Sequence, residues 1–278
     1  MKLKYLGTAA AEAIPALFCE CEVCRKSRAK GGRHFRTRSQ ALLDGTVLLD
    51  FPCDTAVHMM QNGLSLLNIP YCLITHVHSD HFAPSEMAYI RKGYATVLPE
   101  RFSGFRVFGS EDLAPALAPV TEQSPDRIFY TQVEPYKPFP VGDYRVTALR
   151  AHHGTPHPYN YLIERDGKAL LYAHDTSTFL PETWDYLAAH PVRLSLVSLD
   201  CTIANRERPS SPTSTHMCLP DNIATRERLT ALGLTDEKTV FVLNHFSHNG
   251  PDSDYDTFRP IGEANGFLVS YDGMEVEF

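Results

Sequence analysis

The chain has 278 residues, 43% of them hydrophobic, and a formal net charge of −7 at pH 7. A chain of this length can bury a large core, and we expect residues 1–278 to form one domain. The negative charge argues against a broad nucleic-acid-binding surface, because proteins that bind polyanions usually present a basic face. No apolar run approaches the ~20 residues that cross a bilayer, so no membrane partner is expected.

The first expected element is a short amphipathic strand at Met1–Leu6, which lacks the charged and apolar regions of a signal peptide. Together with seven cysteines, an odd number, this start favours a reducing cytoplasm. A CxCxxC cluster follows, formed by Cys19, Cys21 and Cys24. Thiolates at this spacing suit a tetrahedral structural zinc. Three thiolates need a fourth ligand, and the candidates are His34, His216, Cys218 and His248.

A basic segment that contains Arg36 and Arg38 comes next. Guanidinium groups can pair with a phosphate, but the same pattern suits a solvated basic turn, which we favour. The apolar run 47–49 then predicts a strand that ends at Asp50, and residues 54–67 show helical spacing.

Residues 76–81 carry the strongest signal in the chain, three histidines and an aspartate in the order HxHxDH. They follow the apolar run 71–75, which predicts a buried strand. Imidazole and carboxylate groups hold a divalent metal and leave it hydrolytically useful. Alternate side chains of an extended segment share a face, so His76 and His78 can converge on one ion. Asp80 and His81 lie beyond the strand end and can therefore address a second ion.

Six residues cannot complete two coordination shells, so the hypothesis requires further ligands after later strands. α/β enzymes place functional side chains directly after strands. Three later apolar runs fit: 144–149, followed by His152 and His153; 169–173, followed by His174 and Asp175; and 240–243, followed by His245 and His248.

The remaining segments complete an alternating pattern of strands and helices. We expect helices at 84–92, 181–190 and 221–232, and a buried strand at 194–199. The proline-rich segment 115–140 is expected to be a surface connection. The polar segment 205–220 is long enough to form a lid, which would carry His216.

The ordered set of histidines and aspartates resembles the metallo-β-lactamase-fold hydrolases over nearly the whole chain. The resemblance implies an α/β fold, a four-layer αββα sandwich of two mixed β-sheets, with two divalent metals at one sheet edge. It implies that Asp175 bridges the two ions. The first ion would be held by His76, His78 and His153, and the second by Asp80, His81 and His245.

The resemblance also assigns neighbouring residues. His153 is preferred to His152 because Gly154 matches the turn of the family, and His174 is taken as a neighbour of Asp175 rather than a ligand. Asp50 matches a buried aspartate that supports the histidine ligands. The alternative for Asp50 is an ordinary turn residue at a strand end.

A narrower resemblance is to the PhnP-like phosphodiesterases, which act on a phosphoribosyl cyclic phosphate. It is carried by the CxCxxC loop, by HxxH at 245–248 and by the segment 271–275. It implies that His248 completes a Cys3His structural zinc, and that His216 is a catalytic general acid or phosphate contact. An exposed loop histidine is the alternative for His216. The first loop, 7–12, departs from the glycine-rich loop of this group, which leaves the substrate open.

We therefore expect a metal-dependent phosphodiesterase that cleaves a small cyclic phosphodiester. Two divalent ions, Zn, Mn or Fe, would hold a bridging hydroxide, and Asp80 would be catalytic through the second ion. The alternatives are a nuclease that acts on RNA ends, an ester or thioester hydrolase, and a non-hydrolytic protein similar to PqqB. The sequence leaves a homodimer open.

Overall fold

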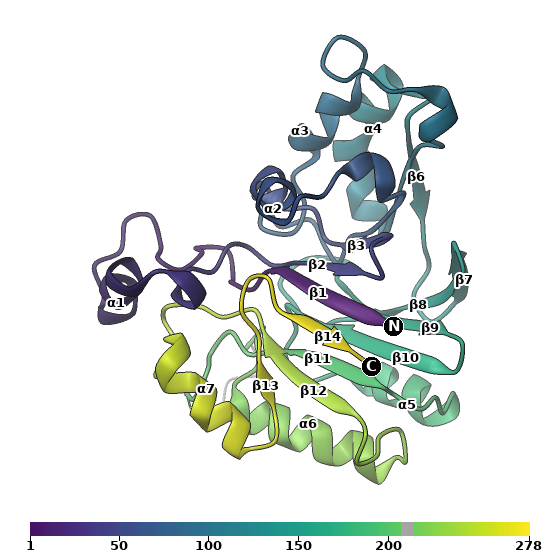
Figure 1. Ribbon diagram of the computed structural model, residues 1–278. Helices are drawn as coiled ribbons and strands as arrows, with labels where there is room; N and C mark the ends of the chain where they lie inside the picture. Colours follow the sequence, from purple (N-terminus) through teal and green to yellow (C-terminus); the bar gives the residue numbers. More distant parts are fainter. Residues whose placement is uncertain (207–213) are drawn as a thin grey trace.

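Two seven-stranded β-sheets lie at the centre of the protein, and the computed structural model describes residues 1–206 and 214–278 (Figure 1). The first sheet has the order β14 (Glu275–Glu277), β1 (Lys2–Gly7), β2 (Gln40–Leu43), β3 (Val47–Leu49), β4 (Tyr71–Leu73), β5 (Phe105–Gly109), β6 (Ile128–Gln132). The second has the order β13 (Leu268–Val269), β12 (Val240–Asn244), β11 (Leu196–Asp200), β10 (Lys168–Ala173), β9 (Tyr159–Arg165), β8 (Tyr144–Arg150), β7 (Pro138–Val141).

Both sheets are mixed, and helices cover their outer faces. Pairing is parallel from β3 to β6 and from β10 to β13, and antiparallel between the other neighbours. The α-helices are α1 (Glu22–Lys30), α2 (Thr55–Asn62), α3 (Pro84–Met87), α4 (Ala114–Gln123), α5 (Pro181–Ala189), α6 (Leu219–Ala231) and α7 (Tyr255–Ala264). Short 3-10 turns are η1 (Gly32–His34), η2 (Leu66–Asn68), η3 (Ala88–Ile90), η4 (Pro99–Arg101) and η5 (Glu111–Leu113).

The alternation of side chains along the strands builds three apolar layers. The middle layer joins the inner faces of the two sheets, and Leu49 and Leu73 of the first sheet share it with Leu170 of the second. Outside the first sheet, Met87 of α3 and Leu117 of α4 belong to a second layer. The third layer packs α5, α6 and α7 against the second sheet. The expected four-layer αββα sandwich is confirmed.

The parallel strands deliver their following residues to one edge of the sandwich. In the second sheet, Ala173 of β10 pairs with Leu199 of β11, and Leu199 pairs with Leu243 of β12. The residues after these three strands therefore leave the sheet side by side. In the first sheet, β3 and β4 run parallel in the same way, with Leu49 opposite Leu73. Segments far apart in sequence thus meet at one edge.

The prediction for 115–140 was wrong, because this segment holds α4, β6 and β7 rather than a surface connection. Three of its prolines are placed where secondary structure tolerates them, although Pro119 lies inside α4. Pro115 lies in the first turn of α4, where a missing amide hydrogen costs little. Pro138 and Pro140 lie on β7, an edge strand of the second sheet.

Two other expected elements differ in detail. The helix expected at 54–67 is shorter, since α2 ends at Asn62 before Gly63, whose φ of 61° is left-handed. The helix expected at 84–92 is divided into α3 and η3. The expected lid at 205–220 includes residues 207–213, which lie outside the described residues. Within the described part of the chain, no helix has the length and apolar character needed to cross a bilayer.

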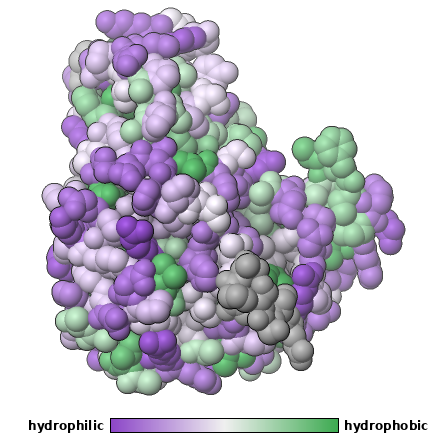
Figure 2. Space-filling view, turned by 180° about the vertical axis from the view of Figure 1, so that it is seen from behind, coloured by the Kyte–Doolittle hydropathy of each residue, from purple (hydrophilic) through white to green (hydrophobic). Residues whose placement is uncertain are grey.

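A lobe formed by the loop after β1 and by α1 stands out from the side of the sandwich (Figure 1). Figure 2 shows this lobe from behind, with apolar surface on it. Leu17 and Phe18 in its loop are 78% and 101% exposed, so apolar packing does not hold this turn in place. Instead, the Arg28 guanidinium donates to the carbonyl oxygens of Ala16 and Cys19, at 3.0 and 2.7 Å.

Candidate metal centre

The HxHxDH loop turns back on itself directly after β4. The backbone N–H groups of His81 and Phe82 both donate to the carbonyl oxygen of His78, at 3.0 and 2.8 Å. This tight turn brings Asp80 and His81 back beside His76. The six-residue motif therefore presents its four ligand side chains to one place, at the sheet edge where β10, β11 and β12 also end.

The first donor set contains His76, His78, His153 and Asp175. His78 Nδ1 lies 3.0 Å from His76 Nε2 and 3.1 Å from His153 Nε2. Asp175 Oδ2 lies 3.2 Å from His76 Nε2 and 3.8 Å from His153 Nε2. Metal–ligand distances of ~2.0–2.2 Å separate neighbouring ligand atoms around one ion by about 2.9–3.5 Å. The set therefore fits one divalent ion.

The second donor set contains Asp80, His81, His245 and again Asp175. His81 Nε2 lies 2.8 Å from Asp175 Oδ2, 3.1 Å from His245 Nε2 and 3.4 Å from Asp80 Oδ2. Asp175 Oδ2 is thus close to the donor atoms of both sets. The two predicted sets are brought together with Asp175 between them, as a binuclear metal site requires.

Hydrogen bonds on the far side of the histidine rings fix which nitrogen faces each donor set. His81 Nδ1 donates to Asp50 Oδ2 at 2.7 Å, and the other Asp50 oxygen accepts from the N–H and hydroxyl of Thr75. His76 Nδ1 lies 3.0 Å from the same Thr75 hydroxyl. Asp50 therefore occupies the supporting position that the resemblance implied, and Thr75 shares it. Such partners orient metal-binding imidazoles and raise their basicity.

The two ligands from later loops have partners of the same kind. His245 Nδ1 donates to the Thr202 hydroxyl at 2.7 Å, and Thr202 in turn donates to Asp200 Oδ2 at 3.1 Å. His153 Nδ1 donates to the carbonyl oxygen of Thr215 at 3.3 Å. In both histidines Nε2 is left for the donor sets.

The electrostatics of the centre are those of a site built for cations. Burial lowers the pKa of His81, but Asp50, Asp80 and Asp175 together raise it well above its ordinary value. Burial raises the pKa of Asp80, but His81 and His245 hold it well below its ordinary value. Asp175 Oδ1 is buried without a hydrogen bond. Buried carboxylates need a paired positive charge, and a divalent ion supplies it.

Three residues of the centre have left-handed backbones. Asp50, Asp175 and His245 have φ angles of 69°, 54° and 64°. This conformation is uncommon for residues other than glycine and costs free energy. Each lies just beyond a strand, at the point where the chain turns toward the metal ligands. The strain accompanies the placement of functional side chains at the sheet edge.

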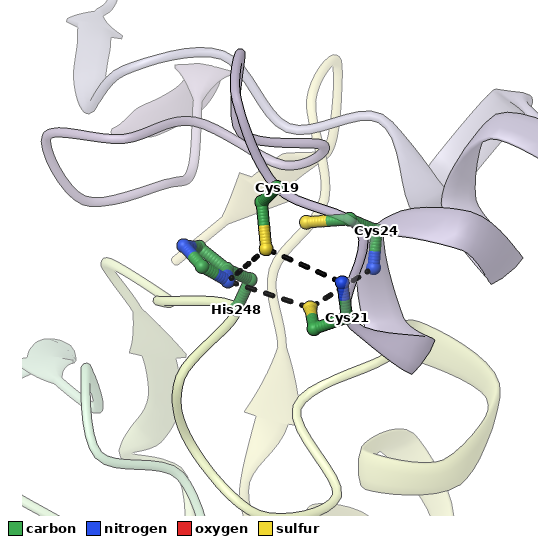
Figure 3. Close-up of side chains that lie close together, drawn as sticks. All are labelled: Cys19, Cys21, Cys24 and His248. Atoms are coloured by element: carbon green, nitrogen blue, oxygen red, sulfur yellow. Dashed lines mark hydrogen bonds between the residues drawn. The ribbon is translucent and has the colours of Figure 1, made fainter.

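The thiolate cluster forms a second, separate site. Cys19, Cys21, Cys24 and His248 point toward one another (Figure 3). His248 Nδ1 lies 3.4 Å from Cys19 Sγ and 3.5 Å from Cys21 Sγ. Tetrahedral zinc with Zn–S near ~2.3 Å and Zn–N near ~2.0 Å separates sulfur from nitrogen by about 3.5 Å. The four side chains therefore fit a Cys3His zinc.

The thiols differ in how readily they lose a proton. A hydrogen bond from the Cys21 amide lowers the pKa of Cys19. Burial raises the pKa of Cys24 to about 12. A zinc ion would displace this proton on binding, which couples metal uptake to proton release.

The other candidates for the fourth zinc ligand lie elsewhere. His34 Nε2 faces Asp256 at 3.2 Å, the Cys218 thiol donates to Asp221, and His216 lies at the binuclear centre. His152 lies outside both donor sets. His174 is fully buried and bonds Ser198 and Asn244.

Arg36 is not in a solvated turn, whereas Arg38 is partly exposed. Arg36 is 2% exposed, and its guanidinium donates to the Thr8 hydroxyl and the Ser270 carbonyl oxygen. It also lies 4.2 Å from the ring centroid of Phe246, which adjoins His245. Arg38 pairs with Asp54 at 3.2 Å. Neither belongs to a metal donor set, and Arg36 is occupied in supporting the loop that carries His245.

Sequence reasoning missed Asp200 as a residue of the site. Its Oδ2 lies 3.1 Å from His216 Nδ1, and it forms a fourth group of donors with Asp175, His216 and His245. The available signal was its position, since it ends the buried strand β11 just as Asp50 follows β3.

Comparisons with known proteins agree with the fold. Residues 46–246 match the sequence profile of the beta-lactamase superfamily domain. No curated protein sequence matches the chain. Solved structures share the fold over the whole chain: a diphosphatase from the PhnP family (19% identity, TM-score 0.73, 96% of that chain), Zn²⁺-bound PqqB from Methylobacterium extorquens (18%, 0.77, 100%) and the short form of human tRNase Z (16%, 0.67, 99%).

Replacing Asp80 with alanine is expected to remove one active-site ion and leave the other ions bound. Asp80 contributes to the second donor set, whereas the first set and the thiolate site do not include it. Elemental analysis of the metal-reconstituted protein should show a loss of about one equivalent. Asp126→Ala, at an exposed carboxylate outside every donor set, is the control. Unchanged stoichiometry in Asp80→Ala would contradict the assignment.

Replacing Cys24 with serine is expected to remove only the structural metal. The binuclear donors should keep their ions, while the thermal unfolding midpoint should fall by roughly 5 °C or more, because the metal cross-links two distant loops. Elemental analysis and calorimetry measure the two effects. Cys53→Ser is the matched control, since Cys53 is exposed and outside the cluster. If both variants keep the same metal content, the thiolate site does not exist.

Proposed function

The chain belongs to the metallo-β-lactamase superfamily and is a metal-dependent hydrolase, and we propose that it is a phosphodiesterase of the PhnP-like group that cleaves a small cyclic phosphodiester. The observation that carries the proposal is the placement of His216. Its Nδ1 lies 3.1 Å from Asp175 Oδ1, so an imidazole stands directly beside the carboxylate shared by both donor sets. A proton donor next to two metals suits expulsion of an alkoxide leaving group.

The similar structures support phosphoryl chemistry without specifying the substrate. One is a diphosphatase and another is a tRNase. The Cys3His arrangement and the HxxH segment also support membership of the PhnP-like group. A small substrate is favoured over a polynucleotide because the chain carries a net charge of −7, which opposes a long polyanion but not one phosphate next to two cations.

The exposure of the ligands indicates how a substrate reaches the centre. Asp80, His81 and His245 are buried, whereas His78 is exposed and His153 and His216 are partly exposed. The open side of the centre is therefore the side of the first donor set and His216. A phosphoryl group that enters there meets the metal ligands and the proton donor together.

In the proposed mechanism, the two donor sets would hold two divalent cations, which would supply a hydroxide nucleophile at neutral pH and neutralise charge on the phosphoryl oxygens. Asp175 holds the two donor sets together, and Asp50 and Thr75 keep His81 and His76 in their ligand orientations. His216 donates a proton to the leaving oxygen. Burial lowers its pKa, but Asp200, Asp175 and Asp80 raise it to about 9.

A substrate screen tests the proposal directly. The protein, reconstituted with Zn²⁺, Mn²⁺ or Fe²⁺, is assayed against cyclic and linear phosphodiesters, an RNA 3′ end, a thioester and a lactone. We expect a cyclic phosphodiester to be cleaved with kcat/KM of roughly 10⁴ M⁻¹ s⁻¹ or more, well above the other classes. A metal-loaded protein that cleaves only the thioester, the lactone or the RNA would refute the phosphodiester proposal and favour that class. A protein that cleaves none would favour the non-hydrolytic alternative.

Replacing His216 with alanine is expected to lower kcat on an alkyl phosphodiester by about 10²-fold or more while metal content stays constant, since His216 lies outside the two metal donor sets of the proposal. Steady-state kinetics and elemental analysis measure the two effects. His152→Ala is the matched control, because His152 comes from the same edge but contributes to neither set. Equal turnover in His216→Ala would remove this residue from the mechanism.

A further inference from the structure

A chain of short hydrogen bonds runs from the C-terminal segment to Asp50. Asp272 Oδ2 lies 2.6 Å from the Thr37 hydroxyl, and this hydroxyl lies 2.7 Å from His58 Nε2. His58 Nδ1 lies 2.7 Å from Gln40 Oε1, and Gln40 Nε2 donates to the Asp50 carbonyl oxygen at 2.9 Å. These contacts connect the C-terminal segment with the turn behind the metal ligands.

The middle of this chain is closed to water. His58 on α2 and Gln40 on β2 are fully buried. The backbone of β1 passes directly over the His58 ring, since a Cβ atom at Gly7 would lie only 2.9 Å from its Cε1. Buried polar groups must find their partners within the protein. The hydrogen atoms of the chain can therefore be assigned from the contacts themselves.

The orientation of the Gln40 amide follows from its two acceptors. Its nitrogen donates to the Asp50 carbonyl oxygen and to the Thr55 hydroxyl at 3.0 Å. The Thr55 hydroxyl gives its own hydrogen to the Pro52 carbonyl oxygen at 2.7 Å. Gln40 Oε1 must then face His58, so His58 Nδ1 carries a hydrogen and donates it.

The two contacts of the Thr37 hydroxyl require one hydrogen more than the usual protonation states supply. A single hydroxyl hydrogen cannot serve both an ionised Asp272 and the bare Nε2 of a neutral His58. A proton on either residue completes both bonds. Burial lowers the pKa of His58 to about 4 and raises the pKa of Asp272 to about 6. The proton therefore resides on Asp272, which donates to Thr37, and Thr37 donates to His58.

Three charged groups face the chain, and burial outweighs them. Arg36 lowers the pKa of Asp272, to which it is linked through one intervening hydroxyl. Asp54 of the turn before α2 favours a charged His58, but it is itself paired with Arg38 at 3.2 Å. The arrangement of a neutral acid and a neutral imidazole avoids a buried ion pair and its desolvation cost.

We propose that Asp272 is a protonated acid that, through the Thr37 hydroxyl, clamps His58 and α2 to the C-terminal segment, and that loss of its proton opens this clamp. When the proton leaves, the Thr37 hydroxyl turns to the Asp272 carboxylate and His58 Nε2 loses its donor. Asp272 lies where the chain passes from β13 of the second sheet to β14 of the first. The clamp is thus a pH-sensitive link between the two halves of the sandwich, whatever the substrate.

NMR of the metal-loaded protein tests the protonation states. Long-range ¹H–¹⁵N spectra, with His58→Gln to assign the signal, read the His58 ring from about pH 5 to about pH 8. We expect a neutral ring with Nδ1–H throughout, and an Nε2 shift that changes together with the Asp272 carboxyl ¹³C signal at a midpoint near pH 6. A doubly protonated His58 in this range, or an Asp272 that stays ionised at its lower end, would overturn the proposal.

Two variants test the relay through Thr37. In Asp272→Asn, the amide oxygen can accept from both the Thr37 N–H and its hydroxyl, so His58 should show its high-pH spectrum at every pH. Thr37→Val keeps the N–H but removes the hydroxyl, so the Nε2 transition should vanish. Thr230→Val, at an exposed threonine of α6, is the matched control and should keep it. A transition that survives in either test variant would show that His58 responds to another group.

The pH dependence of stability gives an independent measurement. The pKa of Asp272 is raised from 3.8 to about 6 in the folded protein, so its contribution to stability is present at low pH and is lost as the pH rises through 6. Between about pH 4.5 and about pH 7.5, the unfolding equilibrium constant of the native protein should rise about 20-fold relative to that of Asp272→Asn. Urea titrations of both proteins at each pH measure this ratio, in which effects of the metal centre cancel. A ratio that stays constant or falls would refute the buried acid.

Discussion

The shared carboxylate of Asp175 is the constraint on which the centre depends. Its Oδ2 lies between two sets of donors that come from four separate chain segments. Without a cation this arrangement is unfavourable, because buried carboxylates face one another among desolvated imidazoles. Protons or metal ions between the carboxylates relieve this repulsion. The folded chain therefore favours binding of divalent ions. The packing of the two sheets offsets the electrostatic cost of the centre.

The register of the strands in the two sheets brings the ligand segments together around Asp175. Parallel strands bring the residues that follow them to one edge, and the left-handed turns at Asp50, Asp175 and His245 direct those residues toward a common point. The turn after β12 is further held from outside: the Phe246 N–H donates to the Thr8 carbonyl oxygen, and the Ala10 N–H donates to that of Phe246. Arg36 beneath Phe246 completes this support. The backbone of the first loop therefore supports the turn that carries His245.

How far the sequence predicts the site depends on the kind of residue. The HxHxDH motif is rare enough to be identified, and it turns the later histidines and aspartates, each a weak signal alone, into expected ligands; the structure brings these donors together. Asp200 carried the same signal after the run 194–199 and was missed, whereas Thr75 and Thr202 are not identifiable in this way, because their roles arise from contacts with residues distant in the sequence. The prediction of a solvated turn was wrong for Arg36. A basic residue near a turn is usually hydrated, but here an aromatic ring and a carbonyl group contact the guanidinium in place of water. The prediction of a surface connection at 115–140 was wrong because edge strands and first helical turns accept proline.

His245 and His248 show how one short segment can serve two sites. They are three residues apart, yet His245 Nε2 faces the second donor set and His248 Nδ1 faces the thiolates. Ser247 and Asn249 between and after them both donate to Glu12 of the first loop, at 2.9 and 3.0 Å. A metal held by the thiolates thus fixes the same segment that carries a ligand of the active centre. Because a left-handed residue such as His245 is strained, its geometry persists only if its surroundings define it from several sides, and the thiolate site supplies one of those sides.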